Sequence, residues 1–147
     1  MHIRSFTILD IQPILSLFDK NTPAFFSPEE RADLIFYLEN EVENYFVLEV
    51  ETTIVACGGY NKGPAISEMR ISWDLVDPDY QGKGYGSALL SYRIGKIKDD
   101  KTINLITVRT SQMAYKFYEK HQFVINEIVE DYWAEGFDLY SMVFAEE

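Results

Sequence analysis

The chain has 147 residues and a mass of 17.1 kDa, which allows one domain with a continuous core but not two, so residues 1–147 should form a single domain. Hydrophobic residues make up 47% and charged residues 25%, as in soluble globular proteins, and no apolar run is long enough to cross a membrane. The formal net charge of −11 argues against a nucleic-acid partner, because binding a phosphate backbone needs a basic face.

In the first half of the chain, the pattern predicts a strand at 2–8, a helix from Asp10 to about Asp19, a loop at 21–26, a helix from Pro28 to about Glu43, and strands at 45–51 and 54–60. Ser27 is a typical N-cap, and Glu30 stands three residues later, as in a capping box. Thr52-Thr53 predicts a hairpin between the two strands, and Gly58-Gly59 indicates a β-bulge or a close backbone approach.

In the second half, the pattern predicts a strand at 66–76, a helix from Tyr85, a strand at 102–108, a helix at 111–121, and strands at 123–130 and 137–145 joined by a loop at 131–136. Leu90, Ile94 and Ile97 have the i, i+4, i+7 spacing of a helix that packs on a core. The order of strands and helices is that of a mixed α/β domain.

The N-terminus lacks the basic segment, apolar stretch and cleavage site of a secretory signal, so a cytoplasmic location is expected. The single cysteine, Cys57, excludes an internal disulfide. Two distant histidines without a cysteine cluster give no metal-ligand spacing, so no metal is expected. The sequence does not fix the oligomeric state, and a homodimer is compatible with it.

The charge is unevenly distributed along the chain. Residues 83–120 hold eight of the thirteen basic residues but only three acids, so this segment carries +5 and the remainder −16. A basic segment of this kind can hold an anionic cofactor, while an acidic remainder attracts a cationic amine over a long range. A lysine-rich, solvated helix surface explains the same numbers, so both interpretations stay open.

A glycine-rich turn separates the strand at 66–76 from the helix that follows it. Gly82, Gly84 and Gly86 lack a Cβ atom and permit positive φ, so successive backbone N–H groups can point into one concavity at a helix N-terminus. Such a nest binds a phosphate or a pyrophosphate. A plain strand-to-helix turn that uses glycines for tight geometry is the structural alternative.

Two common phosphate-binding loops do not fit this turn. A nucleotide-triphosphate loop needs a glycine where Asp77 stands and a serine or threonine where Gly84 stands. The dinucleotide fingerprint needs a further glycine at a position that Ser87 or Leu89 occupies. Neither fold is therefore indicated.

The pattern Gln-x-x-Gly-x-Gly, formed by Gln81, Gly84 and Gly86 after an apolar strand, resembles the acetyl-CoA signature of the GNAT family of N-acetyltransferases. A second segment at 111–123, Ser-x-x-Ala-x-x-Phe-Tyr-Glu-Lys-x-x-Phe, resembles the helix that carries the tyrosine of that family, followed by the next strand. Two motifs in this order and at this distance are more specific than either alone.

The resemblance implies a fold and an activity. The fold is a single α/β domain with a mixed, mostly antiparallel central sheet of about seven strands flanked by four helices. The activity is acetyl-CoA-dependent transfer of an acetyl group to a primary amine of a small molecule or a protein by direct attack. A non-catalytic acyl-CoA-binding or regulatory module is the alternative. The identity of the amine and any preference for a longer acyl chain stay open.

The acetyl-CoA site is expected around the glycine turn. The nest and the N-terminal end of the following helix serve the pyrophosphate, and Lys83 adds positive charge. By the resemblance, the backbone of Val76 holds the pantetheine arm and polarises the thioester carbonyl. The family often has Asn in place of Ser111 and Gly in place of Gln122. The residues expected to bind the cofactor are Val76, Gln81, Gly82, Lys83, Gly84, Tyr85, Gly86, Ser87 and Ser111.

Two residues are expected to act in catalysis. Tyr118 matches the tyrosine of the family that protonates the leaving thiolate, and a packing tyrosine is the alternative. Glu68 is expected to take the proton of the amine, with Asp74 or a water molecule as the alternatives. Glu68 and Asp74 stand at even positions of one predicted strand, so they share a face unless a bulge intervenes.

The acceptor is expected to enter between the loop at 21–27 and the loop at 131–136. By the fold resemblance, both loops lie on the side opposite the phosphates of the cofactor. Both contain aromatic residues, which a soluble surface seldom exposes without a reason.

Overall fold

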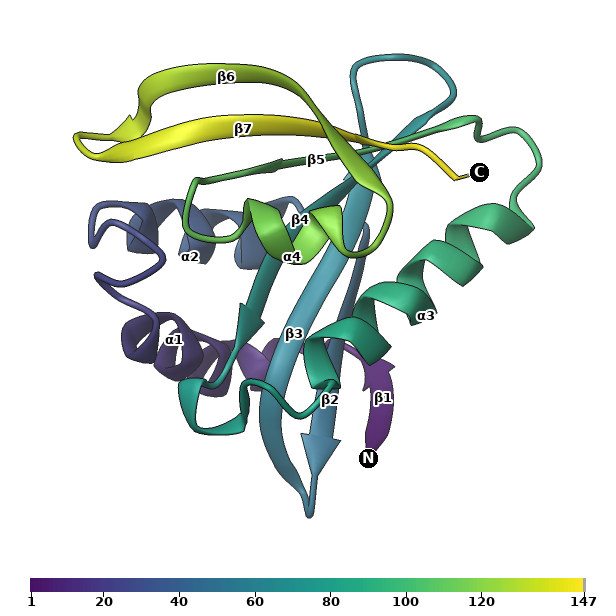
Figure 1. The fold of residues 1–147 in the computed structure, drawn as a ribbon. Helices are drawn as coiled ribbons and strands as arrows, with labels where there is room; N and C mark the ends of the chain where they lie inside the picture. Colours follow the sequence, from purple (N-terminus) through teal and green to yellow (C-terminus); the bar gives the residue numbers. More distant parts are fainter. Residues whose placement is uncertain (147) are drawn as a thin grey trace.

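The computed structural model describes residues 1–146, and Glu147 lies outside the described part. Seven strands form one sheet in the order β1-β2-β3-β4-β5-β7-β6 (Figure 1). Neighbouring strands run antiparallel except β4 and β5, which are parallel. The predicted mixed α/β fold, with a mostly antiparallel seven-stranded sheet and four α-helices, is confirmed.

The strands are β1 (His2–Ser5), β2 (Asn44–Val50), β3 (Thr53–Lys62), β4 (Glu68–Val76), β5 (Leu105–Thr110), β6 (Phe123–Ala134) and β7 (Phe137–Phe144). The helices are α1 (Ile11–Lys20), α2 (Glu30–Asn40), α3 (Tyr85–Asp99) and α4 (Tyr115–Glu119), with short 3₁₀ turns η1 (Ile8–Asp10) and η2 (Pro78–Tyr80).

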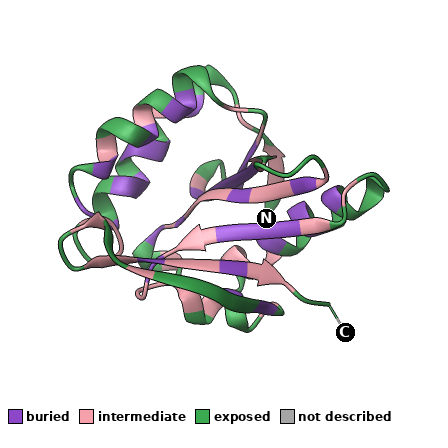
Figure 2. Cartoon of the chain, turned by 90° about the horizontal axis from the view of Figure 1, so that it is seen from above, coloured by how far each residue is buried: buried purple, intermediate pink, exposed green. Residues whose placement is uncertain are grey.

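The helices cover both faces of the sheet (Figure 1). α3 and α4 pack on one face, through residues that include Leu90, Ile94, Ile97 and Tyr118, and we call this the α3 face. α1 and α2 pack on the other, which we call the α1 face. Leu90, Ile94 and Ile97 are at most 9% exposed, as their helical spacing predicts. Figure 2 shows buried positions gathered on the central strands and on the inward sides of the helices.

The first two helices begin near the expected positions for different local reasons. The backbone N–H of Ser27 donates to Glu30 Oε2 (2.9 Å), so the predicted capping contact forms, although α2 ends three residues earlier than expected. The carboxylate of Asp10 does not cap α1. It turns back to accept the backbone N–H of Thr7 (2.8 Å) and to pair with Arg4 (2.9 Å).

The C-terminal hairpin differs from its predicted form. β6 continues to Ala134, four residues further than expected, and only Glu135 and Gly136 remain between the strands. The reason is a bulge, because the pairing with β7 shifts between Val129 and Ala134 and Asp131 has a φ of 54°. The Asp131 carboxylate accepts the backbone N–H of Gly136 (2.8 Å). The polar run that resembles a loop in the sequence is therefore part of a bulged hairpin.

Three further boundaries are shifted. β1 ends at Ser5, because the next turn of chain is the 3₁₀ turn η1. β5 begins at Leu105, later than predicted. α4 begins only at Tyr115, because the residues before it form a turn in which the carbonyl of Ser111 accepts the N–H groups of Ala114 (3.1 Å) and Tyr115 (3.0 Å).

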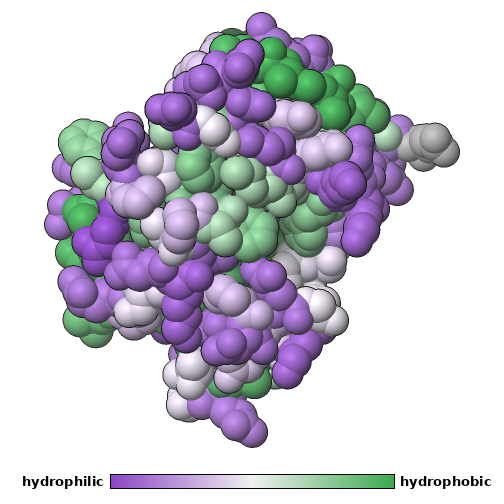
Figure 3. All heavy atoms as spheres, turned by 60° about the vertical axis from the view of Figure 1, so that its left-hand side comes forward, coloured by the Kyte–Doolittle hydropathy of each residue, from purple (hydrophilic) through white to green (hydrophobic). Residues whose placement is uncertain are grey.

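Among residues 1–146, no helix is both long and apolar enough to cross a membrane. The outer strand β6 exposes Val124, Ile125 and Ile128, and Figure 3 shows a hydrophobic band along the upper edge of the molecule, the level at which β6 runs. A homodimer stays a prediction.

Candidate active site

The sheet opens between its two parallel strands. β4 and β5 stop pairing after Ile71 and Val108, although β4 continues to Val76 and β5 to Thr110. Beyond that point the two strands separate, and their facing backbone groups make no ladder hydrogen bonds with each other. A ligand can therefore reach the backbone of β4 from this gap.

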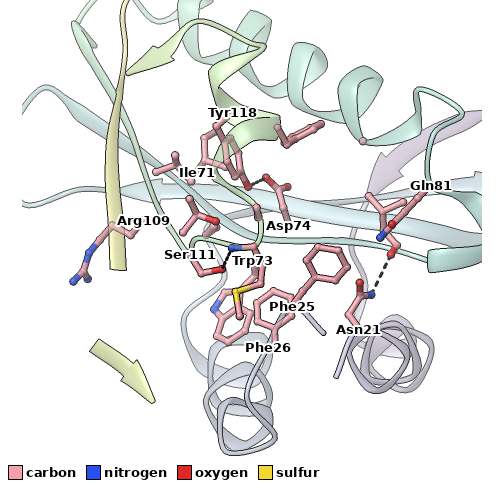
Figure 4. A pocket seen from close by; sticks show the side chains of 18 of the residues that line it. Asn21, Phe25, Phe26, Ile71, Trp73, Asp74, Gln81, Arg109, Ser111 and Tyr118 are labelled. Carbon is pink, nitrogen blue, oxygen red and sulfur yellow. Dashed lines mark hydrogen bonds between the residues drawn. The ribbon is translucent and has the colours of Figure 1, made fainter. Parts of the chain in front are cut away.

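A cavity of about 580 Å³ lies at this gap, a size typical of small-molecule sites, which span roughly 300–1,000 Å³ (Figure 4). Its wall includes Val76, which packs on the α3 face, and Trp73 and Phe26, which pack on the α1 face. The cavity thus reaches both faces of the sheet. Figure 4 shows Gln81 and Arg109 at its opposite ends.

A β-bulge in β4 lies beside the gap. The pairing between β3 and β4 shifts between Cys57 and Gly59, so that two residues of β4, Trp73 and Asp74, stand opposite one residue of β3. Trp73 has a φ of 49°, in the left-handed region. The extra residue reverses the alternation of side chains along the rest of the strand.

Because of this bulge, Glu68 and Asp74 lie on opposite faces of the sheet. Glu68 is 5% exposed, and its Oε2 accepts the hydroxyl of Thr107 (2.6 Å) while its Oε1 accepts the N–H of Ala65 (3.2 Å). Asp74 lines the cavity and Glu68 does not. The structure therefore does not bring Glu68 together with Tyr118.

Asp74 lies at the centre of a polar cluster with Arg93 and Tyr118. One carboxylate oxygen pairs with Arg93, which is 1% exposed and also donates to the carbonyl of Gly59 (3.0 Å). The other oxygen accepts the hydroxyl of Tyr118 (Figure 4). Gly58 makes room for the cluster, since a Cβ there would stand 2.1 Å from Asp74 Oδ1. Burial and the Asp74 carboxylate raise the pKa of Tyr118 well above its ordinary value.

The glycine turn has positive φ at two of its three glycines. Gly82 has a φ of 77° and Gly84 a φ of 84°, and no atom lies within 4 Å of a Cβ built on either. Gly86 is helical, and a Cβ there would stand 3.2 Å from Val76 Cγ2. Close packing against Val76, and not the backbone conformation, therefore favours glycine at this position. α3 begins at Tyr85, so the unpaired N–H groups of its first turn lie at the wall of the cavity.

The end of β4 is held by the end of α1. Asn21, which is 3% exposed, donates from Nδ2 to the carbonyls of Val76 (3.0 Å) and Leu17 (2.7 Å). Figure 4 shows the bond from Asn21 toward the strand end. Lys20 pairs with Asp77 (2.8 Å) just beyond it. The role of Asn21 cannot be predicted from the sequence, because an asparagine in a loop carries no pattern that identifies its hydrogen-bond partner.

The other predicted residues of the turn differ in position. Gln81 and Ser87 line the cavity, and Ser87 Oγ lies 2.9 Å from His121 Nε2. Lys83 is not part of the wall, and its Nζ lies 5.5 Å from the centre of the Tyr80 ring. Any charge that Lys83 adds acts from outside the cavity.

The two departures from the family pattern have clear local roles. Ser111 is 7% exposed, lines the cavity and accepts the N–H of Met113 at its Oγ (3.3 Å). Gln122 has a φ of 73°, so it adopts the left-handed conformation that favours glycine. The turn geometry is thus kept without the glycine.

Aromatic side chains, including Phe25, Phe26 and Trp73, gather below the strands in Figure 4, and we call this part of the cavity its aromatic end. Phe25 and Phe26 come from the segment between α1 and α2, and Phe26 stacks on Trp73 with ring centres 6.1 Å apart (Figure 4). Trp133 comes from the β6–β7 hairpin and donates from Nε1 to the carbonyl of Thr110 (3.0 Å). Both segments predicted to flank the acceptor contribute to the wall, and entry of the acceptor between them stays a prediction.

Four charged residues that the sequence did not single out as site residues also line the cavity: Glu30, Arg70, Arg109 and Lys120. Glu30 is 8% exposed, and burial raises its pKa above the ordinary value. Arg70 and Arg109 come from the neighbouring strands β4 and β5. Only the pairing of these strands shows that the two arginines lie close together, so the sequence offered no direct signal.

The family model described as an acetyltransferase (GNAT) domain matches residues 41–125. Among curated proteins, the chain is similar to the amino-acid acetyltransferase of Actinobacillus pleuropneumoniae serotype 5b (strain L20), with 28% identity over 92 residues. That match covers 60% of this chain and 20% of the relative, so the chain spans about a fifth of the length of the curated relatives that it matches.

Solved structures share the fold over almost the whole chain. A protein from Desulfovibrio desulfuricans, described as an acetyltransferase of the GNAT family, has a TM-score of 0.80 at 18% identity, covering 97% of this chain and 96% of that protein. An aminoglycoside 6'-N-acetyltransferase complexed with coenzyme A has a TM-score of 0.79 at 13% identity, covering 100% and 99%. At these identities the likeness is one of fold.

Proposed function

The chain belongs to the GNAT family of acetyltransferases, and from this premise we propose that it transfers an acetyl group from acetyl-CoA to a primary amine by direct attack. The observation that carries the proposal is the cavity at the β4–β5 gap, which joins the glycine turn to the aromatic end and reaches both faces of the sheet. Tyr118 and Asp74 line the same cavity. A passage of this kind lets a thioester approach from one side and an amine from the other.

The glycine turn fits the pyrophosphate of acetyl-CoA. Gly82 and Gly84 leave open space where other residues would carry a Cβ, and the first turn of α3 adds unpaired N–H groups and the positive end of its dipole. The open edge of β4 beside Val76 fits the pantetheine arm. The residues proposed to hold the donor are Val76, Gln81, Gly82, Gly84, Tyr85, Gly86, Ser87 and Ser111, with Lys83 adding charge from outside.

Tyr118 is proposed to stabilise the leaving thiolate. Its hydroxyl donates to Asp74 in this structure, and the proposed role requires it to turn toward the sulfur as the thioester bond breaks. The pKa of Tyr118 is raised, whereas that of a thiol is about 8.5, so complete proton transfer to sulfur is uphill and the hydroxyl acts mainly as a hydrogen-bond donor. Arg93 keeps the charge of Asp74 paired when the hydroxyl turns away.

The amine has to lose a proton before it can attack. Glu68 does not line the cavity, and Asp74 is already engaged by Arg93 and Tyr118. We therefore propose that Glu30 is the general base that accepts the proton of the amine. Glu30 lines the cavity, and burial raises its pKa.

Glu30→Gln tests this assignment. Glutamine keeps an oxygen for the N–H of Ser27, so α2 should still be capped. In the wild type, kcat/KM should rise with pH as Glu30 loses its proton, and the variant should lack this rise and lose about 10²-fold in activity. If the variant keeps the same rise, the proton leaves through Asp74 or water instead.

Two measurements separate the enzyme from a non-catalytic acyl-CoA-binding module. Titration calorimetry with acetyl-CoA tests the donor site, and thiol release in the presence of amines tests transfer. The panel includes amino acids and an aminoglycoside, because two of the similar proteins are named for those acceptors. Transfer to an amine supports the enzyme, whereas binding without any transfer supports the non-catalytic module.

A further inference from the structure

Two arginines on the α1 face line the cavity, Arg70 on β4 and Arg109 on β5. In the parallel register, Arg70 stands beside Thr107, so Arg109 follows two residues further along the neighbouring strand. Ile71 and Val108 pack on the α3 face, and alternation therefore directs both arginines to the opposite face. Figure 4 shows Arg109 at the end of the cavity away from Gln81.

Neither guanidinium is fully paired. Arg70 Nε is buried and has no hydrogen-bond partner among the described residues. The Glu68 carboxylate oxygen closest to Arg70 lies 3.6 Å from Nη2, too far for a hydrogen bond, and it already accepts the hydroxyl of Thr107 (2.6 Å). Burial and, secondly, the charge of Arg109 lower the pKa of Arg70. The two cations stand on the same face of adjacent strands, and the Glu68 carboxylate offsets their repulsion only in part.

Arg109 is held by aromatic rings instead of an acid. Its guanidinium carbon lies 4.8 Å from the centre of the Tyr132 ring and 5.6 Å from that of Trp133. Within residues 1–146 it forms no ion pair. Stacking fixes the plane of a guanidinium and leaves the N–H donors at its edge free for a ligand.

A buried donor without a partner and two neighbouring cations are unfavourable until an anion joins them. A guanidinium presents parallel N–H groups that match the two oxygens of a carboxylate. We infer that Arg70 and Arg109 form a subsite for a carboxylate of the acceptor, so that the amine is acetylated on an amino acid or a similar aminocarboxylate. This inference rests on the proposed function.

The test compares matched acceptors at saturating acetyl-CoA, each amino acid against its carboxamide. We expect kcat/KM to be about 10–100-fold higher for the best amino acid than for its amide, because the amide leaves the arginines unpaired. Arg70→Gln and Arg109→Gln should each lower this ratio about tenfold, mainly through KM. Arg70→Lys, which keeps the charge but not the fork of donors, should restore part of the ratio.

Arg31→Gln is the matched control. Arg31 pairs with Asp19 (2.9 Å) at the surface and does not line the cavity, so this variant should keep the ratio of wild type. Circular dichroism checks that each variant is folded. Amino acids and amides used equally well, or a ratio unchanged by Arg70→Gln, would overturn the carboxylate subsite while leaving acetyl transfer intact. Preference for an aminoalkyl phosphate over the carboxylate would also overturn it.

A binding measurement keeps the inference testable even without turnover. In calorimetry with the CoA-loaded protein, N-acetyl amino acids should bind about 10–100-fold more tightly than their amides, and Arg70→Gln should remove the difference. Equal binding of acid and amide contradicts the subsite. Absence of acetyl transfer together with this preference would instead contradict the proposed function alone.

Discussion

At Tyr118, one hydroxyl links the proposed reaction to a buried ion pair. Tyr118→Phe should lower kcat about 10²-fold, the low end of the range for acid–base assistance, because a thiolate is already a tolerable leaving group. The affinity for acetyl-CoA should not change, since charge develops on sulfur only as the thioester breaks. Steady-state kinetics and calorimetry check the two expectations, and an unchanged kcat would make Tyr118 a packing residue.

The environment of Tyr118 also sets the pH range of this step. A tyrosine with an ordinary pKa near 10 would make kcat fall as the pH approaches ~10, but burial and Asp74 raise the pKa of Tyr118. If Tyr118 must be protonated for this step, kcat should therefore fall only above about pH 10. A fall of kcat below about pH 9 that disappears in Tyr118→Phe would contradict the raised pKa of Tyr118.

Cys57 offers a test of the core that is independent of activity. It is fully buried, accepts the hydroxyl of Tyr45 at Sγ (3.3 Å), and burial raises its pKa from 9.0 to about 12. A raised folded-state pKa stabilises the protein below pH 9, and this contribution is lost as the pH rises toward 12, because the unfolded thiol ionises first.

The free energy of unfolding should therefore fall above pH 9, with Cys57 contributing up to about 1.4 kcal/mol per pH unit. Cys57→Ala should show a shallower fall. Urea unfolding between about pH 8 and 11 measures both slopes. Equal slopes would mean that the thiol ionises as readily in the folded protein as in the unfolded chain.

At the scale of elements, the glycine turn and the start of α3 form the proposed phosphate site. Gly84→Val should weaken acetyl-CoA binding, because a branched residue is strained at a φ of 84° and its side chain enters space that the ligand needs. No protein atom lies within 4 Å of the new Cβ, so the strain comes from the backbone and should cost about 1–3 kcal/mol in stability.

Gly95→Ala is the control in the same helix. Gly95 lies inside α3, and a Cβ there meets no atom within 4 Å, so alanine should stabilise the protein by about 0.5–1 kcal/mol. It should not change acetyl-CoA binding. Calorimetry distinguishes the two variants, and a folded Gly84→Val protein that binds like wild type would refute the phosphate site.

The aromatic end of the cavity depends on two segments far apart in the sequence. Truncating Phe25 and Trp133 to alanine should raise the KM of the amine and leave the acetyl-CoA affinity nearly unchanged, because both side chains line the cavity and come from the two segments proposed to flank the amine. Trp133→Phe is the milder variant, since it removes the hydrogen bond to Thr110 but keeps an aromatic ring. Weaker acetyl-CoA binding with an unchanged KM of the amine would show that the acceptor does not bind beside these two side chains.

Local chemistry explains which elements the sequence could predict. The capping contact between Ser27 and Glu30, the core spacing of α3 and the positive φ values in the glycine turn all depend on neighbours within a few residues. The bulge at Trp73 does not, because an aromatic residue in an apolar run indicates an ordinary strand. That one bulge decides which carboxylate of β4 reaches the cavity.

At the scale of the whole molecule, the site is built from contacts that no single segment encodes. The cluster of Asp74, Arg93 and Tyr118 joins β4, α3 and α4, and Asn21 ties α1 to the end of β4. The family motifs predict a donor end because most of its proposed residues lie within one stretch of chain. The proposed acceptor end combines the 25–30 segment, β4, β5 and the β6–β7 hairpin, so its residues required the three-dimensional arrangement.

Charge acts differently over a long range, around the whole molecule, and at short range, inside the cavity. The net charge of −11 favours the approach of a cationic amine over a long range, and salt weakens this effect. Inside the cavity, Arg70 and Arg109 favour an anionic group at short range. An acceptor with both an ammonium and a carboxylate satisfies both conditions.

The central claim is that donor and acceptor meet in one cavity, and a two-substrate rate measurement tests it most directly. With acetyl-CoA and the best amino acid, free thiol and acetylated amine should form in equal amounts, and the lines of a double-reciprocal plot should intersect, as a ternary complex requires. Parallel lines, or thiol release without an acetylated amine, would contradict direct transfer across the β4–β5 gap.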